Sequence, residues 1–195
     1  MTRLSEDGLD LIFREARTFT RYTDEPVAEA QLIEIWDLMK YGPTSANLLP
    51  ARILWCRSQE AKDKLASFAT PENVEPIRKA PVTAIIAMDM KFFEYGDRLF
   101  PIADVRSWFE GSEDEVREPA LRNSTLQGAY FMIAARAVGL DTGAMSGFDS
   151  AAVDEAFLSG TSHRTNFLCT LGHGDRSSLH ERMPRPPFDW FNTIL

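Results

Sequence analysis

Hydrophobic residues recur at helical spacing twice within the first 41 residues of the chain. The first stripe comprises Leu9, Ile12, Phe13 and Ala16, and the second comprises Leu32, Ile35, Trp36 and Met39. Spacings of three and four residues place each stripe on one face of a helix, and we expect that face to be buried. The pattern therefore predicts one helix that starts after Ser5 and ends near Arg17, and a second over residues 29–41.

Three shorter apolar runs predict strands. They cover residues 52–57, 82–88 and 167–171, and the second is rich in β-branched residues. Short continuous runs of this kind are typical of strands in the interior of a sheet. Helical patterns separate the runs, whereas residues 140–148 are punctuated by glycine and predict a loop. Few strands among many helices favour an α+β domain with one sheet.

The segment from Ala120 to Val138 is apolar on almost every side, and Pro119 is well placed at its start. A helix that is apolar all round is buried all round, and in a domain of this size we expect part of its surface to meet a partner subunit. Residues 91–117 are less regular and mix aromatic with charged side chains. They fit either a surface excursion with aromatic anchors or a lid over a site, and the sequence does not choose between the two.

The composition is that of an ordinary globular protein. The 195 residues suit one domain spanning residues 1–195, since neither a repeat nor a linker interrupts the pattern. A net charge of −8 and a pI of about 4.9 disfavour nucleic acid and anionic membranes as partners, because both attract basic surfaces. Cys56 and Cys169 lie in apolar runs, which favours buried thiols in a reducing compartment. With no signal-peptide core and no apolar run of membrane-spanning length, we expect a cytoplasmic protein.

Several kinds of chemistry find no support in the sequence. The three histidines, His163, His173 and His180, lack the spacing and the cysteine neighbours of a metal site, so we expect no metal. The glycine motifs of a hydrolase elbow, a Rossmann site and a P-loop are absent. Polar loops and scattered arginines remain. These suit a ligand that combines a planar ring with a phosphate, because the planar fork of arginine can bind phosphate through two hydrogen bonds.

Residues 41–50, Tyr-Gly-Pro-Thr-Ser-Ala-Asn-Leu-Leu-Pro, join a helix end to a strand. Gly42 can close the helix and Pro43 cannot continue it. The small polar residues that follow could present hydroxyl and amide groups to a ligand. On spacing alone, however, an ordinary turn is the better explanation.

Residues 43–50 resemble the Pro-Ser/Thr-Ser-x-Asn-x-x-Pro loop of the FMN-dependent nitroreductase superfamily. Three further segments resemble that superfamily in the same order, so the match is collinear from about residue 9 to residue 190. They are Arg17-Thr18-x-x-Arg21-Tyr22, the loop over residues 139–148, and Arg185 ahead of Pro186. Thr20 stands where the family usually has an arginine, and Ala144 stands where it usually has a proline.

The resemblance implies a nitroreductase-like α+β fold, with a central, mainly antiparallel sheet flanked by helices, in an intertwined homodimer. It implies FMN as the cofactor, with the phosphate held by Arg17, Thr18, Arg21 and Arg185. The flavin ring would be held by Pro43, Thr44, Ser45, Asn47, Asn73, Ala144, Met145, Ser146 and Gly147. In that arrangement the backbone N–H of Ser146 faces flavin N5. NADH or NADPH delivers a hydride to N5, and the acceptor takes it in a second, ping-pong step, so no acid–base side chain is required.

Four details resemble one branch of the superfamily, the RutE-like malonic semialdehyde reductases of pyrimidine degradation. They are residues 42–47, 106–109, 122–124 and 145–149. This branch implies reduction of malonic semialdehyde (3-oxopropanoate) to 3-hydroxypropanoate, a small carbonyl substrate whose carboxylate needs a cation. Arg106 and Arg122 are the candidates, although an ion pair with Asp104 or Glu110 explains Arg106 about as well. A broad nitro or quinone reductase and a flavin-binding module without turnover are the alternatives.

Overall fold

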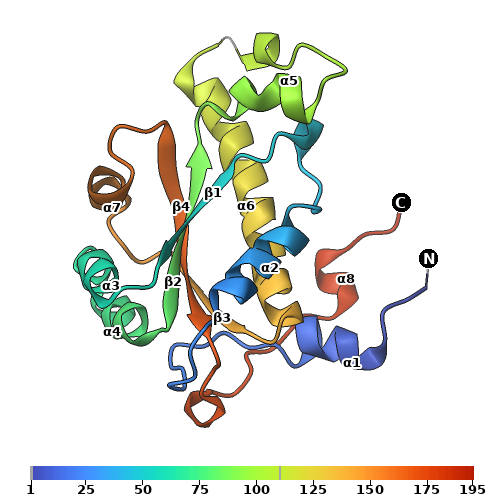
Figure 1. Cartoon of the computed structure of the whole chain (residues 1–195). Coiled ribbons are helices and arrows are strands. Elements are labelled where there is room, and N and C mark those ends of the chain that lie inside the picture. Colours follow the sequence, from blue (N-terminus) through green and yellow to red (C-terminus); the bar gives the residue numbers. More distant parts are fainter. Residues whose placement is uncertain (1, 110) are drawn as a thin grey trace.

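Four antiparallel strands form one sheet in the middle of the folded molecule (Figure 1). The computed structural model describes residues 2–109 and 111–195. Strand β1 spans Ala51–Cys56, β2 spans Val82–Asp89, β3 spans Asp141–Met145 and β4 spans His163–Gly172. Their order across the sheet is β1-β2-β4-β3, and each neighbouring pair is antiparallel. Helices flank both faces, so the predicted α+β fold with a central antiparallel sheet is confirmed.

The longer helices form two layers, one on each face of the sheet. Helices α2 (Glu29–Met39) and α6 (Glu113–Ala137) cover one face, and α3 (Gln59–Ala66), α4 (Pro71–Lys79) and α7 (Ser150–Phe157) cover the other. Strand β2 lies between these layers. Its Ile86 packs with side chains of α2 and α6, whereas the neighbouring Ile85 packs with those of α3, α4 and α7. Alternating side chains therefore bury both faces of β2, which explains its uninterrupted apolar sequence.

Strand β3 corrects the sequence analysis, which predicted a loop over residues 140–148. All residues of β3 pair with β4 in antiparallel register. Gly143 concealed the strand, because glycine is depleted in strands. The structure requires glycine at this position, since a Cβ on Gly143 would lie 2.1 Å from the carbonyl oxygen of Phe19. The three strands that were predicted are confirmed as β1, β2 and β4.

Helix α6 begins earlier than the sequence analysis predicted. It starts at Glu113, and Pro119 lies inside it. Ser112 and Glu115 form a capping box at the true start, where the Ser112 N–H donates to Glu115 Oε2 over 2.8 Å. The predicted start at Pro119 is wrong because this capping signal, and not the proline, marks the first turn.

Several apolar faces that we expected to be buried are exposed in the single chain. The stripe of Leu9, Ile12, Phe13 and Ala16 contains no buried residue, and Phe13 is 54% exposed. Helix α1 covers only Glu6–Leu9 and continues as a π-helical turn over Asp10–Arg14. Trp36 on α2 and Leu126 on α6 are likewise exposed. The patterns predicted apolar faces correctly, but the described part of this chain does not cover them.

Residues 91–109 and 111–117 contribute to a small, separate apolar core beyond one end of the sheet (Figure 1). Phe92, Val105 and Val116 pack there with Met88 of β2 and Ala120 of α6. The short helix α5 (Gly96–Leu99) and two 3-10 turns, Phe92–Tyr95 and Arg106–Phe109, carry this segment. Buried aromatic side chains therefore anchor it to the sheet and to α6.

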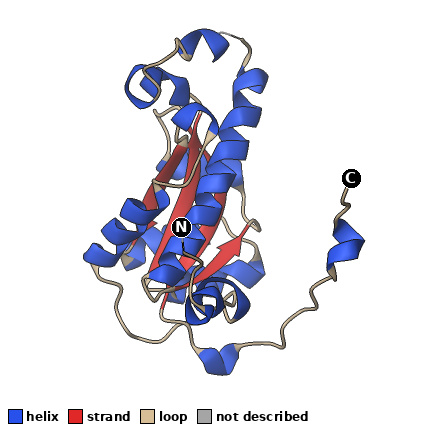
Figure 2. Cartoon of the chain, turned by 90° about the vertical axis from the view of Figure 1, so that its right-hand side faces the viewer, coloured by secondary structure: helices blue, strands red, loops and turns tan. Residues whose placement is uncertain are grey.

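The last part of the chain leads away from the sheet (Figure 2). Every residue from Glu181 to Leu195 is exposed, including those of the short helix α8 (Phe188–Phe191). Exposed aromatic side chains gather here, and Trp190 is 74% exposed. Within the described residues, no helix combines the length and the apolar character needed to cross a membrane.

Candidate functional site

Four arginines from three separate parts of the chain line one cavity of about 350 Å³. Arg17 follows the N-terminal π-helical turn, Arg136 lies in the last turn of α6, and Arg182 and Arg185 come from the exposed C-terminal segment. The other residues at this cavity, which we name the arginine pocket, are Phe13, Ala16, Thr18, His180, Glu181 and Met183. The fold thus brings together Arg17, Thr18 and Arg185, which lie far apart in the sequence.

Hydrogen bonds to backbone carbonyls hold the arginine pocket together. The Arg17 guanidinium donates to the carbonyl of His180, and Arg182 Nη2 donates to the carbonyl of Ala16 over 3.1 Å. These two bonds tie the N-terminal segment to the C-terminal one. Among the residues that the structure describes, none of the four arginines is ion-paired with a carboxylate. Their charge is therefore available to an anion, and guanidinium N–H groups match phosphate oxygens well.

Arg136 differs from the other three arginines in its surroundings. Its Nη1 donates to the carbonyl of Ile12 over 2.9 Å, whereas its Nε is buried and has no partner in the described part of the chain. Burial lowers the pKa of Arg136 from its usual value. Arg136 was not predicted from the sequence, because a cation in the last turn of a helix is ordinarily explained by the helix dipole.

Thr18 places the arginine pocket beside strand β3. It forms a parallel bridge with Thr142, and the Phe19 N–H donates to the Thr142 carbonyl over 3.0 Å. Residues 144 and 145 follow on the same strand, about 7–10 Å farther along at the usual rise of a strand. Arg21, which the resemblance assigns to the phosphate, is exposed and does not line the pocket.

The turn after β3 leaves the backbone N–H groups of Ser146 and Gly147 without an acceptor among the described residues. Ser146 is exposed, and no acceptor within residues 2–109 and 111–195 receives its N–H. The next residue is fixed, because the Gly147 carbonyl accepts from Asn73 Nδ2 over 3.0 Å and from Thr70 Oγ1 over 3.1 Å. Asn73 and Gly147 therefore lie together, with the amide nitrogen of Asn73 engaged by the turn itself.

The loop between α2 and β1 is strained. Ala46, Asn47 and Leu49 have positive φ angles of 46°, 52° and 44°, and this conformation costs about 1–3 kcal/mol for each non-glycine residue. Helix α6 holds the loop, since Asn123 Oδ1 accepts the Ser45 N–H over 2.8 Å. Strain of this kind persists only where the surroundings fix it, and it is typical of functional sites.

Three further polar groups of this loop are used inside the chain. Thr44 Oγ1 accepts the Leu49 N–H over 3.2 Å, Asn47 Nδ2 donates to the Leu99 carbonyl over 2.8 Å, and the Pro43 carbonyl accepts from the Tyr130 hydroxyl over 3.0 Å. None of residues 43–47 lines the arginine pocket, and Asn123, which holds Ser45, is separated from Arg136 by about 20 Å along α6 at the usual helical rise. One chain alone therefore does not bring residues 43–47 to the arginine pocket.

The two arginines assigned to the substrate are both outside the arginine pocket. Arg122 is ion-paired with Glu118, one turn earlier on α6, and its side chain is 64% exposed. Arg106 is exposed at the start of a 3-10 turn. Within the described residues it forms no ion pair with Asp104, and its other suggested partner, Glu110, lies outside them.

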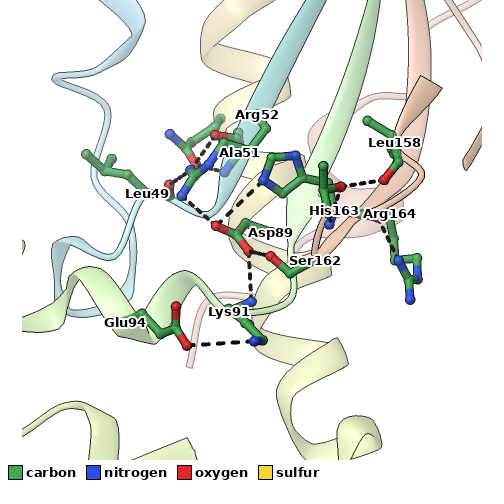
Figure 3. A network of polar contacts seen from close by, with 12 residues as sticks. Leu49, Ala51, Arg52, Asp89, Lys91, Glu94, Leu158, Ser162, His163 and Arg164 are labelled. Carbon is green, nitrogen blue, oxygen red and sulfur yellow. Dashed lines mark hydrogen bonds and ion pairs between the residues drawn. The ribbon is translucent and has the colours of Figure 1, made fainter.

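A buried carboxylate joins the strained loop to the sheet (Figure 3). Asp89, at the end of β2, is 3% exposed and accepts hydrogen bonds from Arg52 Nη2 at 2.7 Å, Ser162 Oγ at 2.6 Å and the Lys91 N–H at 2.8 Å. Arg52 also donates to the Leu49 carbonyl over 3.0 Å, which fixes the exit of the loop. His163 Nε2 lies 3.9 Å from Asp89, and burial lowers the pKa of this histidine.

A model described as the nitroreductase family matches residues 14–173 of this chain. A relative from Burkholderia lata is 51% identical over 189 residues, which cover 97% of this chain and 97% of the relative. A relative from Ralstonia pickettii is 51% identical over 190 residues, which cover 96% of this chain and 97% of the relative. Both relatives carry the provisional name NADH dehydrogenase/NAD(P)H nitroreductase.

Solved structures share the fold at low sequence identity. A provisionally named nitroreductase from Bacillus subtilis superimposes with a TM-score of 0.87 at 22% identity, covering 98% of this chain and 100% of that protein. One from Exiguobacterium sibiricum, solved in complex with FMN, superimposes with a TM-score of 0.85 at 20% identity and covers 100% of both chains.

Proposed function

The chain belongs to the nitroreductase family, and on that premise we propose that it is an FMN-dependent oxidoreductase that uses NADH or NADPH as the reductant. The observation that carries this proposal is the arginine pocket, whose positive charge has no carboxylate partner among the described residues and lies beside β3. The names of the relatives support NAD(P)H as the reductant. The FMN complex of a protein with the same fold supports FMN.

The residues present fit a flavin phosphate and the edge of its ring. We assign the phosphate to Arg17, Thr18 and Arg185, which line one cavity and whose guanidinium and hydroxyl groups are hydrogen-bond donors. The free N–H of Ser146 suits a ring nitrogen such as N5, and Ala144 to Gly147 would flank it. FMN, when bound, supplies the hydride chemistry, so the protein has only to bind and orient it.

We propose that the site is shared between two subunits of a homodimer. Residues 43–47 do not line the arginine pocket of their own chain, so we place this loop against the flavin of the partner. Exposed apolar side chains on α2 and α6 support an interface, because apolar surface costs roughly 25 cal/mol per Å² to leave in water. They are Ile33, Trp36, Leu38, Leu121 and Leu126. Light scattering should find a dimer at micromolar concentration, and a flavin-bound monomer would contradict the shared site.

We propose that the acceptor is 3-oxopropanoate. Its reduction gives 3-hydroxypropanoate and is a step of pyrimidine degradation. Arg106 is the proposed cation for its carboxylate, since Arg122 is already ion-paired with Glu118. The second candidate function is a broad nitro or quinone reductase, which the names of the relatives favour. A flavin-binding module without turnover is the third candidate function.

We place the protein in the cytoplasm, because Cys56 and Cys169 are buried free thiols.

Two measurements test these proposals. The first is the absorption spectrum of the purified protein, with chromatography of any flavin released on denaturation; absence of FMN and no binding of added FMN would overturn the cofactor proposal. The second is steady-state oxidation of NADH and NADPH with 3-oxopropanoate or an uncharged quinone, for the parent and Arg106→Ala. Loss confined to 3-oxopropanoate supports the role of Arg106. Turnover of the quinone alone favours the broad reductase, and no turnover with any acceptor favours the module.

A further inference from the structure

We infer that Arg136 is a further phosphate-binding residue of the arginine pocket and that it makes the site selective for a phosphorylated flavin over riboflavin. The inference rests on the proposed function, because it adds a residue to the FMN site. Arg136 reaches the pocket from the last turn of α6, whereas the other arginines belong to the two terminal segments of the chain. No motif of the sequence analysis contains Arg136.

Arg136 lies between two cavities. Besides the arginine pocket, it lines a smaller cavity of about 130 Å³, and only Ala16 and Arg136 are common to both linings. Glu15 and Asp141 are among the residues that line the smaller cavity, and Glu181 is among those that line the arginine pocket. None of these is within ion-pair distance of Arg136, and Asp141 Oδ2 already accepts the Gly174 N–H over 3.0 Å. The counterion of this half-buried guanidinium is thus not supplied by the described residues.

The hydrogen bonds of Arg136 are also incomplete. A guanidinium carries five N–H donors, and one of them is directed to the carbonyl of Ile12 over 2.9 Å. A purely structural role, in which Arg136 bonds Ile12 and favours the helix dipole, accounts for that bond. It does not account for the Nε atom, which is buried without an acceptor among the described residues. A bound phosphate would provide the missing negative charge, and its oxygens would accept from the terminal guanidinium N–H groups that Ile12 does not use, which offsets the cost of burying an unpaired cation.

Burial should also make Arg136 more selective for the phosphate than the two exposed arginines of the pocket. Arg182 and Arg185 are exposed, so water hydrates them and dissolved salt screens their attraction for an anion. Charges that are partly removed from water attract each other more strongly and are screened less. The contribution of Arg136 to phosphate binding should therefore persist in high salt, whereas that of Arg185 should fade.

The test is an equilibrium titration of the flavin-free protein with FMN and with riboflavin, followed by flavin fluorescence. Arg136→Met should raise the dissociation constant for FMN by roughly 10- to 100-fold, as for the loss of a charged hydrogen bond. It should leave the constant for riboflavin unchanged, since riboflavin lacks the phosphate. The matched control is Arg117→Met, which removes an exposed arginine near the other end of α6 and should retain the parental preference. At about 0.5 M salt, the effect of Arg136→Met should remain and that of Arg185→Met should shrink.

Each outcome has one meaning. If the parent binds neither flavin, the proposed function itself fails. If the parent prefers FMN and Arg136→Met keeps that preference, Arg136 is not a phosphate ligand. If Arg136→Met weakens both flavins equally, Arg136 is a structural residue and the inference is overturned. Circular dichroism checks the fold, and Arg136→Lys serves where the methionine variant does not fold. The lysine variant retains the charge without the fork, so the inference expects a smaller loss that is still confined to FMN.

Discussion

Replacing the buried Asp89 with asparagine should destabilise the protein more than the same change at an exposed aspartate such as Asp37. Asp89→Asn keeps the shape of the side chain and removes its charge. In the parent, that charge pairs with Arg52 at 2.7 Å, and the two side chains are 4% and 25% exposed. The amide of asparagine can still accept from Ser162 or Lys91, but it cannot neutralise Arg52.

The magnitude follows from this burial. Removing one partner of a fully buried ion pair costs about 3–5 kcal/mol, because the other charge is left without a counterion. Arg52 is a quarter exposed, so water compensates part of the loss and we expect about 3 kcal/mol. Domains are stable by only about 5–15 kcal/mol, which makes this a large fraction of the total.

Urea unfolding measures the effect. Parent and Asp89→Asn must be compared at equal flavin saturation, since a bound ligand raises apparent stability. The midpoint should fall by about 1–1.5 M urea. Asp37→Asn is the matched control: its ion pair with Lys40 at 2.5 Å joins side chains that are 54% and 36% exposed, and its loss should cost less than about 1 kcal/mol. Equal, small losses in both variants would refute the view that Asp89 is a buried member of the network.

Three further changes test other parts of the structure. Gly143→Ala places a Cβ 2.1 Å from the Phe19 carbonyl oxygen and should cost about 1–3 kcal/mol in a thermal melt through overpacking, so an unchanged melt would contradict this close approach. Asn123→Ala leaves the Ser45 N–H without its acceptor and should cost about 1–3 kcal/mol and speed hydrogen exchange at that amide; unchanged exchange would show that α6 does not hold the loop. Burial lowers the pKa of His163, so the folded protein resists protonation of this ring: its stabilising contribution is present above pH ~6.5 and is lost as the pH falls through the lowered pKa. The difference in unfolding free energy between the parent and His163→Gln should therefore shrink as the pH is lowered to 5, and a constant difference would contradict it.

The elements that could be predicted from the sequence are those whose burial is decided within the chain. Strand β2 is covered on both faces by helices of the same chain, and its apolar run was sufficient to predict it as a strand. Strand β3 was missed because the neighbouring backbone of Phe19 demands glycine at Gly143, and glycine resembles a loop signal. Trp36 was expected to be buried and is 40% exposed. A hydrophobic pattern reports that a face is apolar and does not report which molecule covers it.

The residues of the candidate site were likewise predicted only in part. Arg17 and Arg185 were identified through resemblance, and nothing in their local spacing predicts that residues so far apart share one cavity. Arg136 could not be recognised because its position in a helix end already has an ordinary explanation. Asp89 and His163 pair only through the register of β2 with β4, which depends on how the whole sheet assembles.

The arginine pocket also has a consequence for how the molecule is made. The chain is synthesised from its N-terminus, and the sheet is complete once β4 ends at Gly172. Arg182 and Arg185 emerge later, roughly a second later at the usual rate of synthesis. The arginine pocket therefore cannot form until the last segment of the chain has been made, and a chain that stopped at the end of β4 would have the whole sheet without this pocket. On the proposed function, FMN would link the first and last segments of the chain, which already contact each other through Arg17 and Arg182.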